Sequence, residues 1–537
     1  MRREQVFHGW GEPGAGPRIG PHALALLREG LGVSGDVVSA PVPPARVRLR
    51  APAEAPGLRS RLEGAVGPAH VRSDDAIRLL RAAGKSYLDL LALRAGDAGE
   101  APDLVVAPGS AAEIAAVLAA CAQAGAAVVP FGGGTSVVGG VAGERGGFDA
   151  VVCLDLARLD GVRTVDATSR RAVAGAGMRL PELDHALGAH GLRLGHYPQS
   201  YEWATAGGCA ATRSAGQAST GFGRFDDLVA AVRCVTPAGE LAPLGAPGSA
   251  AGPDLTRLVL GSEGTLGVIA ELTLRVRPVA AATRYEAWLV PSFADGCSAL
   301  RALAQDEVAP DVARLSDTTE TELTFTLGGL PRVLRGRRGD RCLLIAGWEG
   351  EPGAIAGRRA AAAHRVRGLR LGRGVGEGWA THRFDGPHLR DDLMDRGVLV
   401  ETLETATTWA RLDALHGRVR EALADALAAT PPLVGCHVSH LYPDGASLYF
   451  TVLAPQEAED PAGQWRRAKR AAGDAIAAAG ATITHHHAVG RDHGPWLGAE
   501  AGETGLAALR AVKAALDPAG IMNPGKLLGL DPSIVRG

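Results

Sequence analysis

The sequence predicts an α+β protein with more than one domain, and three observations lead to that prediction. Its 537 residues exceed what one hydrophobic core usually holds. A strand–helix–strand pattern over residues 104–131 ends in a run of glycines, and from about residue 281 strand-like runs alternate with alanine- and arginine-rich helices. We therefore expect an N-terminal extension (1–95), a first domain (96–280), a second domain (281–480) and a C-terminal segment (481–537).

Composition and charge narrow the classes of function. The formal net charge of −2 gives no reason to expect a nucleic-acid partner, and a hydrophobic content of 46% is typical of a folded soluble protein. The seven cysteines are scattered without a Cys-x-x-Cys pair, which argues against a disulfide framework and fits a reducing compartment. No apolar run resembles a signal peptide or is long enough to span a bilayer. We expect a cytoplasmic protein.

The first domain is predicted to open with a strand over residues 104–107. Ser110 then caps a helix, Glu113 completes a capping box, and Gly125 ends the helix. A second strand over residues 126–131 leads directly into the glycines. Further elements are expected as strands over residues 151–156, 268–276, 285–290, 342–348 and 448–453, as helices over residues 181–191, 254–260, 411–429, 465–479 and 505–516, and as a strand that carries three histidines after residue 481.

The first candidate binding site is the glycine-rich loop PFGGGTS at residues 130–136. Glycines let backbone amides turn inward without a side chain in the way, and several such amides form a nest that can hold a phosphate or pyrophosphate. A glycine-rich turn can equally be purely structural. A G-x-G-x-x-G match at residues 9–14 predicts no nucleotide site, because no strand precedes it and Pro13 stands where the helix should begin.

A second candidate is the segment PQSYEWATAGGCAATRSAG at residues 198–216. It is dense in Ser, Thr, Gly and Ala, and Arg213 is its only basic residue. Such a stretch places many backbone amides and small hydroxyls near one surface without bulk. The alternative is a tight structural loop.

Tyr449 is a candidate for proton transfer. In the alternating run SLYFTV, Ser447, Tyr449 and Thr451 share one strand face, and the apolar residues between them share the other. A phenol on the polar face can exchange a proton with a group in a cavity. The alternative is a strand tyrosine whose hydroxyl is bonded to the backbone.

The triplet His485-His486-His487 is the most unusual local feature. On an extended chain His485 and His487 would point one way, and a His-x-His pair on a strand can offer two metal ligands. With His493 nearby a zinc site is conceivable, but Asp492 is the only local carboxylate at a useful spacing. We therefore favour an active-site histidine cluster and expect no metal.

Two arginine features remain. Arg390-Asp391 precedes ETLETATTW, and an arginine fork suits a phosphate or a carboxylate, although an ion-paired surface arginine is an equal alternative. The cluster RVLRGRRGDR at residues 332–341 could touch an anionic membrane surface, but a solvated loop is the favoured interpretation.

Read in order, these segments resemble the vanillyl-alcohol-oxidase-type FAD flavoproteins and, within them, the alkyldihydroxyacetonephosphate synthase family, over residues 10–528. The motifs that carry the resemblance are PFGGGTS, PQSYEWATAGG with TRSAG, GSEGTLGVI (261–269), Arg390-Asp391 with GVLVETLET, SLYF with Tyr449, HHHAVG (485–490) and DPAGIMNPGKLL. The FAD segments are typical of the superfamily. The histidine triplet and the SLYF tyrosine single out the synthase branch, whereas Gln199 and Cys209 depart from it.

The resemblance implies a two-subdomain FAD-binding domain of the vanillyl-alcohol-oxidase type at residues 96–280, an α+β substrate cap domain at 281–480, and a C-terminal segment that returns to the flavin. The loop at 130–136 would hold the pyrophosphate. Thr135 stands where covalent relatives carry histidine, so we expect FAD to be bound non-covalently. The implied cofactor-binding residues are Pro130, Phe131, Gly132, Gly133, Gly134, Thr135, Ser136, Pro198, Gln199, Ser200, Ala204, Thr205, Gly207, Gly208, Thr212, Arg213, Ser214, Ala215, Glu263, Gly264, Thr265, Leu266, Gly267, Val268 and Ile269.

The resemblance also implies a reaction in ether lipid synthesis. The flavin N5 would attack the acylated carbon of acyl-dihydroxyacetone phosphate, the fatty acid would leave, and a long-chain alcohol would enter without net redox change. Tyr449 would act as acid and base at the carbon-bound proton, Arg390 would hold the phosphate or orient the flavin adduct, and residues 485–487 would polarise the substrate. We also expect a homodimer; a peripheral membrane contact is left open.

Two other functions were weighed. An FAD-dependent dehydrogenase or oxidase of a 2-hydroxy acid such as D-lactate or glycolate would share the scaffold. Such relatives tend to carry an acidic residue before His-Gly-Val-Gly, whereas this chain reads His-His-Ala-Val-Gly at residues 486–490. A histidine-rich zinc-binding protein would be colourless and would leave the glycine-rich segments unexplained.

Overall fold

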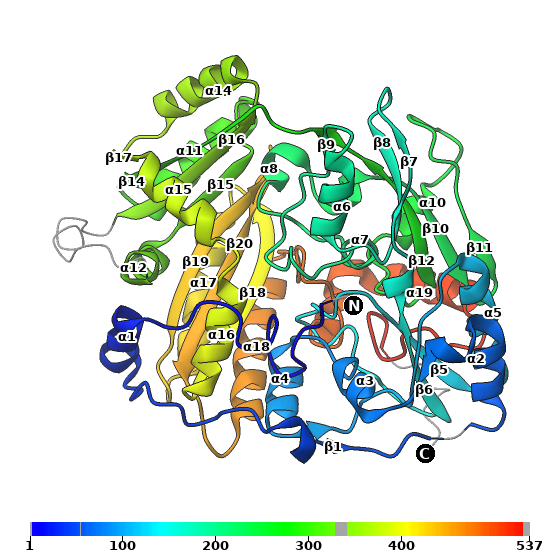
Figure 1. Ribbon diagram of the computed structural model, residues 1–537. Coiled ribbons are helices and arrows are strands. Elements are labelled where there is room, and N and C mark those ends of the chain that lie inside the picture. The colour runs from blue at the N-terminus through cyan, green and yellow to red at the C-terminus, as the bar shows by residue number, and fades with distance from the viewer. Residues whose placement is uncertain (1–2, 54, 328–340, 530–537) are drawn as a thin grey trace.

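The computed structural model describes residues 3–53, 55–327 and 341–529, and its elements build three main sheets (Figure 1). Two sheets lie in the right half of the view and the third, with the strands from β14 onward, occupies the left half. The N-terminal helix α1 (Pro21–Leu31) lies beside the third sheet, far along the chain from its neighbours there. The mixed helix and strand content confirms the α+β prediction.

The first sheet carries the glycine-rich loop. Its four strands, in spatial order, are β2 (Val71–Arg72), β4 (Leu104–Val106), β6 (Ala150–Asp155) and β5 (Ala126–Phe131), with β4, β6 and β5 parallel. Helices α2 (Leu58–Val66) and α5 (Ala111–Gln123) pack on it. Ser110 caps α5 by accepting the N–H of Glu113 at 3.1 Å. The Glu113 carboxylate accepts the N–H of Gly109 at 2.7 Å, instead of the Ser110 amide that a capping box requires.

The second sheet is antiparallel and shares a core with the first. Its strands, in spatial order, are β11 (Gly239–Leu241), β10 (Val229–Thr236), β12 (Val268–Arg275), β8 (Arg171–Gly175) and β7 (Val162–Asp166). Val235, Val268 and Ala270 contact the core of the first sheet. The helices against this sheet are α6 (Leu180–Gly188), α7 (Ala206–Thr212), α9 (Phe225–Leu228) and α10 (Leu255–Val259).

The third sheet is also antiparallel and has seven strands. In spatial order they are β17 (Leu369–Gly372), β14 (Ala282–Val290), β16 (Cys342–Gly350), β15 (Val312–Ser316), β19 (Leu433–Leu441), β20 (Gly445–Pro455) and β18 (Val398–Thr408). One face is buried under α11 (Phe293–Gln305), α14 (Pro352–Arg365), α17 (Leu412–Ala426) and α18 (Pro461–Ala478). Leu448, Phe450 and Val452 are fully buried on that face, so Tyr449 and Thr451 point to the opposite one, as the alternation predicts.

The remaining elements connect or cover these layers. They are α3 (Asp75–Leu80), α4 (Tyr87–Arg94), α8 (Ser219–Phe222), α12 (Thr318–Leu327), α15 (Arg373–His382), α16 (Gly386–Asp395), α19 (Leu497–Leu516) and the two-residue strands β1 (Arg48–Leu49), β3 (Asp97–Ala98), β9 (Leu192–Arg193) and β13 (Arg277–Pro278). No described helix has both the length and the apolarity needed to cross a membrane.

Most predicted elements are confirmed, with ends shifted by a few residues. Helix α19 begins eight residues earlier than residue 505, across a break at Gly502. Helix α2 and strand β2 join the first sheet although they fall in the predicted N-terminal extension, and the division of the chain at residues 95, 280 and 480 stays a prediction. Apart from Arg341, the arginine cluster at 332–341 lies outside the described residues.

Candidate active site

A cavity of about 540 Å³ lies where the three sheets meet. Pro130 of β5, Ile269 of β12 and Tyr449 of β20 all line it. Most of the predicted site residues therefore line this one cavity, although they come from distant parts of the chain. Those that line the cavity are Pro130, Gly132, Gly133, Gly134, Thr135, Ser136, Pro198, Gln199, Ser200, Ala204, Thr205, Gly207, Gly208, Thr212, Ser214, Ala215, Glu263, Gly264, Gly267, Ile269, Arg390, Tyr449, His486 and His487.

The glycine-rich loop presents free backbone donors to the cavity. Within the described chain, the N–H groups of Gly133, Gly134 and Thr135 meet no protein acceptor. A Cβ atom at Gly133 would lie 2.1 Å from the Trp203 carbonyl oxygen, so only glycine lets this loop pack against residues 203–204. Unpaired amides in a tight loop can form an anion-binding nest of the kind that holds a phosphate or pyrophosphate.

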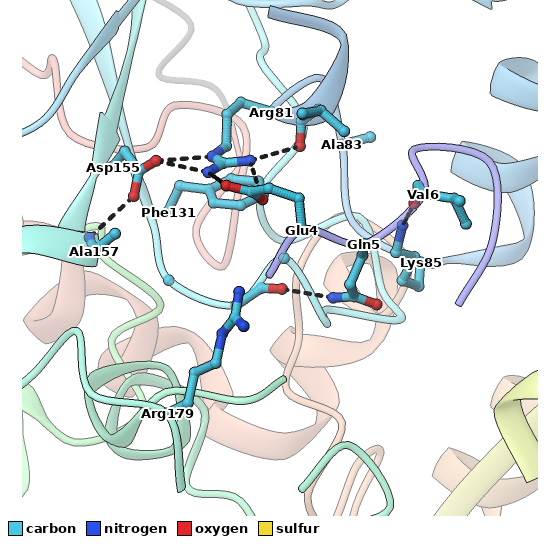
Figure 2. Close-up of a pocket in the computed structure, with 14 residues that line it drawn as sticks. Glu4, Gln5, Val6, Arg81, Ala83, Lys85, Phe131, Asp155, Ala157 and Arg179 are labelled. Carbon is cyan, nitrogen blue, oxygen red and sulfur yellow. Dashed lines mark hydrogen bonds and ion pairs between the residues drawn. The ribbon is translucent and has the colours of Figure 1, made fainter. Parts of the chain in front are cut away.

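The outer side of the loop is held by the N-terminal segment (Figure 2). Gln5 donates a hydrogen bond from Nε2 to the Gly133 carbonyl oxygen at 2.9 Å. Arg81 is ion-paired with Asp155 at 2.8 Å and with Glu4 at 2.9 Å, and its guanidinium lies 5.2 Å from the centre of the Phe131 ring. These residues line a second, smaller pocket, which Figure 2 shows. Phe131, a predicted cofactor residue, faces this pocket instead of the large cavity.

Five other predicted residues also lie away from the cavity wall. Arg213 ends α7 and is ion-paired with Asp226 at 3.0 Å. Thr265 is buried and donates its hydroxyl to the Ser262 carbonyl oxygen at 2.7 Å, and Leu266 and Val268 belong to the packed interior. His485 lies behind the wall, against His440 and Tyr442.

Tyr449 stands beside a hydrogen-bonded cluster of Glu320, His437 and Arg314 that the sequence did not indicate. The ring of His437 stacks on the Tyr449 ring with 4.8 Å between centroids. The Glu320 carboxylate contacts His437 Nδ1 at 3.0 Å, and Arg314 donates to His437 Nε2 at 3.1 Å. Burial raises the pKa of Tyr449 to about 12, so the phenol carries its proton at neutral pH.

The prediction that the three histidines lie on a strand is wrong, and Glu404 of β18 is the physical reason. Its buried carboxylate accepts the backbone N–H groups of His485, His486 at 3.0 Å and His487 at 2.8 Å, and the Thr484 hydroxyl at 2.6 Å. Successive amides of a strand point to opposite sides, so three of them can reach one carboxylate only if the chain curls. Burial would raise the pKa of Glu404, but the surrounding histidines and Thr484 outweigh it and hold the pKa well below its usual value.

Glu263 attaches the same C-terminal segment to the first sheet's side of the cavity. Its carboxylate accepts the N–H groups of Val489 at 2.8 Å and Gly490 at 2.7 Å. Burial raises the pKa of Glu263 to about 7. The Asn523 amide also donates to the Glu263 carbonyl oxygen at 2.7 Å. Residues 485–523 therefore close one wall through two buried carboxylates, Glu404 and Glu263.

Lowering the pH from 7 to 5 is expected to destabilise the protein strongly. Burial lowers the pKa of His196, His485 and His493 to about 3, whereas histidine in an unfolded chain has a pKa of about 6.5. Between these values the unfolded state binds more protons at these three positions, so each histidine lowers the free energy of unfolding by about 1.4 kcal/mol for every pH unit of acidification. Glu263 and Asp492 oppose part of this loss, because burial raises their folded-state pKa to about 7 and the folded protein takes up a proton on each. Urea unfolding at pH 7 and pH 5 measures the loss.

Two variants test this explanation of the pH dependence. His485→Asn should reduce the pH dependence of stability, and His190→Asn, at an exposed position, should not. Equal pH dependence in both variants would contradict the interpretation.

Arg390 of α16 is the cation best placed for an anionic ligand. Its Nη1 donates to the Lys85 carbonyl oxygen at 2.8 Å. Its Nε and Nη2 are buried and have no hydrogen-bond partner in the described part of the chain. Buried guanidinium donors are rarely left unpaired, because the lost hydration costs free energy. Arg390 lines the cavity, so a phosphate or carboxylate of a ligand is the expected partner.

The third sheet changes from polar to apolar along the cavity. On β20 the lining residues run Tyr449, Thr451, Leu453, and the partners of the last two on β18 are Thr402 and Val400. At about 6.7 Å per two residues, Leu453 lies roughly 13 Å from Tyr449. The same apolar region is completed by Ile19, Ala23, Leu26, Leu27, Leu323, Leu389 and Leu393.

Comparison with known proteins agrees with this geometry. The profile of the FAD binding domain matches residues 102–245, and that of the C-terminal domain of FAD linked oxidases matches residues 279–527. An alkyldihydroxyacetonephosphate synthase of Dictyostelium discoideum is 32% identical over 90% of this chain and 82% of its own length, and one of Trypanosoma brucei brucei is 30% identical over 95% and 88%. The chain belongs to the alkyldihydroxyacetonephosphate synthase family. A solved alkyldihydroxyacetonephosphate synthase superposes with a TM-score of 0.84 at 27% identity and covers 98% of this chain and 99% of its own.

Membership of the alkyldihydroxyacetonephosphate synthase family confirms three predictions from the sequence. These are the family resemblance, the fold class and an enzyme that depends on FAD. Several cavity residues were nevertheless missed. Four lining residues lie in segments without a motif: His437, His440, Arg314 and Glu320. Glu404, which does not line the cavity, was noted in the sequence only as part of ETLETATTW. The strand pattern VSHL at 438–441 was the one signal that could have placed His440 on β19.

Proposed function

We propose that this chain is an alkyldihydroxyacetonephosphate synthase, which exchanges the acyl group of acyl-dihydroxyacetone phosphate for a long-chain alcohol. The observation that carries the proposal is one cavity that combines an arginine with two buried N–H groups free of hydrogen bonds among the described residues, a tyrosine–histidine cluster and an apolar region roughly 13 Å away along the same strands. A phosphate, a reacting carbon and an aliphatic chain are the three parts of that substrate. The arginine suits the phosphate, the tyrosine–histidine cluster suits the reacting carbon, and the apolar region suits the aliphatic chain.

FAD fits the remaining wall, and we propose that it binds there without a covalent bond. The free amides at residues 133–135 suit its pyrophosphate, and the small residues at 204–215 and 263–269 leave room for a planar ring system. When bound, FAD supplies the nucleophilic ring nitrogen of the exchange. We assign the cofactor contacts to the predicted residues that line the cavity, and Thr135 provides no side chain for attachment.

The protein's own groups divide the remaining work. Arg390 would fix the phosphate, which sets the position of the reacting carbon. Tyr449 holds a proton at neutral pH and can donate it to that carbon or to a leaving oxygen. His486 stacks on Tyr449 with 6.0 Å between ring centroids, and burial lowers its pKa, so it offers a neutral imidazole that can accept a proton.

The decisive test is an anaerobic visible spectrum of the FAD-loaded protein during two titrations. Acyl-dihydroxyacetone phosphate is expected to bleach the flavin band, and a fatty alcohol alone should restore it while ether product forms. Bleaching by D-lactate that only an electron acceptor reverses would overturn the proposal in favour of a dehydrogenase. A protein that binds no FAD would overturn both functions.

Arg390→Met is expected to raise the KM for the phosphate substrate by 10²-fold or more, because a charge-assisted, bidentate contact contributes about 3 kcal/mol. Arg390→Lys should restore part of the loss, since it returns the charge without the fork. Steady-state kinetics with the phosphate substrate and with its dephosphorylated analogue provide the measurement. A KM that stays at the wild-type value in Arg390→Met would remove Arg390 from the phosphate site.

Ala23→Trp is expected to shift the preferred alcohol toward shorter chains. Ala23 of α1 lines the apolar region, and an indole there would occupy the volume of several methylene groups. Each methylene that loses its place forfeits about 0.8 kcal/mol, so a C16 alcohol should lose at least tenfold in kcat/KM while a C8 alcohol changes little. Ala25→Trp on the same helix, outside the cavity wall, is the matched control. Equal losses for both alcohols would contradict an alkyl site at this position.

All seven cysteines are free, which supports our proposal of a cytoplasmic location. The homodimer stays a prediction, which light scattering of the purified protein would test. A peripheral membrane contact would bring the lipid substrates within reach, and vesicle flotation would test it.

A further inference from the structure

We propose that His440, His485 and His486 form a binding site for one divalent cation of borderline softness, with Zn²⁺ as the probe. One ring nitrogen of each histidine lies within 4.8 Å of the other two. All three side chains are buried or nearly so, and His440 and His486 line the large cavity. Imidazole nitrogens in this number and arrangement suit zinc with one open position.

One distance between the nitrogen atoms is close to that of a zinc site. Zn–N bonds of about 2.0–2.1 Å at tetrahedral angles separate the nitrogens by about 3.4 Å. His485 Nδ1 and His486 Nδ1 are 3.0 Å apart. The His440 and His485 rings are stacked with 4.9 Å between centroids, and the three nitrogens lie within 4.8 Å of one another, so the His440 ring has to rotate to bring its nitrogen to the same ion.

Two hydroxyl groups orient the ligands from behind. Ser219 Oγ lies 2.6 Å from His440 Nδ1, and Tyr442 Oη lies 2.5 Å from His485 Nε2. When these ring N–H groups donate to the hydroxyl oxygens, His440 Nε2 and His485 Nδ1 keep their lone pairs. Metal-binding histidines characteristically use their second ring nitrogen in this way.

The charge balance also favours a cation here. Glu404 Oε2 lies 3.7 Å from His486 Nδ1, and the carboxylate is 1% exposed. Among the described residues, the ion-pair contacts of this carboxylate are His486 Nδ1 and His487 Nδ1, the latter at 3.8 Å from Oε1. Nearby positive charge stabilises a buried carboxylate, and a divalent ion bound to His486 would supply such charge close to Glu404.

Occupation of the site would immobilise His486 beside Tyr449 and place a positive ion at the cavity wall. Resting on the proposed function, we expect the bound ion to inhibit turnover reversibly. The binding itself does not depend on that function, so it can be measured without substrate.

The test uses FAD-loaded protein that has been stripped with a chelator and then dialysed against Zn²⁺ alone. One equivalent of zinc is expected in the wild type, and His440→Gln and His486→Gln should each lose it. His437→Gln, at another buried cavity histidine outside the trio, should keep it. Tyr442→Phe should weaken zinc binding by about 10–100-fold. The flavin spectrum of each variant reports whether it has folded, and Zn²⁺ should raise the unfolding temperature of the wild type but not of His440→Gln.

Less than one equivalent in the wild type, or equal binding by His440→Gln and His437→Gln, would overturn the site. Zinc that binds at the trio without slowing ether formation would overturn the inhibition. Absence of ether formation in the zinc-free wild type would count against the proposed function alone, since the dialysis result stands apart from it.

Discussion

Tyr449→Phe is expected to lower kcat by about 10²–10⁴-fold while FAD stays bound, because it removes the cavity hydroxyl that keeps its proton at neutral pH and is proposed to transfer it to the reacting carbon. The stacked His437 ring and the strand packing behind residue 449 do not involve the hydroxyl, so the fold should be kept. Single-turnover kinetics with acyl-dihydroxyacetone phosphate measure the chemical step directly.

The matched control for Tyr449 is Tyr285→Phe, because the Tyr285 hydroxyl contacts Arg383 away from the cavity wall. The control should keep wild-type turnover. If Tyr449→Phe turned over as fast as the control, proton transfer would have to be assigned elsewhere, and the neutral imidazole of His486 would be the next candidate.

Glu404→Leu is expected to cost roughly 3–9 kcal/mol of unfolding free energy and to abolish activity. The substitution leaves the amides of residues 485–487 buried without an acceptor, and each such group costs about 1–3 kcal/mol. Urea unfolding at pH 7 and the flavin spectrum measure the two effects. Glu404→Gln keeps one acceptor oxygen and should lose less. A Glu404→Leu protein with wild-type stability would show that the carboxylate does not hold the histidine segment.

Local sequence patterns were enough to predict many of the helices and strands and the orientation of Tyr449. The strand Ala126–Phe131 was predicted with the bounds that the structure shows, because an apolar run between Gly125 and the following glycines has well-marked ends. The face of Tyr449 also followed from strict alternation. In both cases the deciding interactions lie within a few residues along the chain.

The features that the sequence did not predict depend on contacts between residues far apart in the chain. The curl at residues 485–487 depends on Glu404, about 80 positions earlier, and no local pattern at the histidines reveals that carboxylate. Likewise, α1 looks like any short amphipathic helix, yet its residues 23, 26 and 27 line the cavity because β18 and β20 of the third sheet form a surface for them. Tertiary contacts of this kind override local preference.

The N-terminal segment has a consequence for synthesis on the ribosome. Gln5 holds the glycine-rich loop, and the backbone N–H groups of Trp10 and Ile19 bond to Asp391 and Asp392. At about 5–20 residues per second, residues near 391 are made roughly 20–80 s after the first twenty. Residues 10–19 must therefore wait without these partners until the chain around residue 391 has been made. Chaperones that bind nascent chains have that interval in which to act on them.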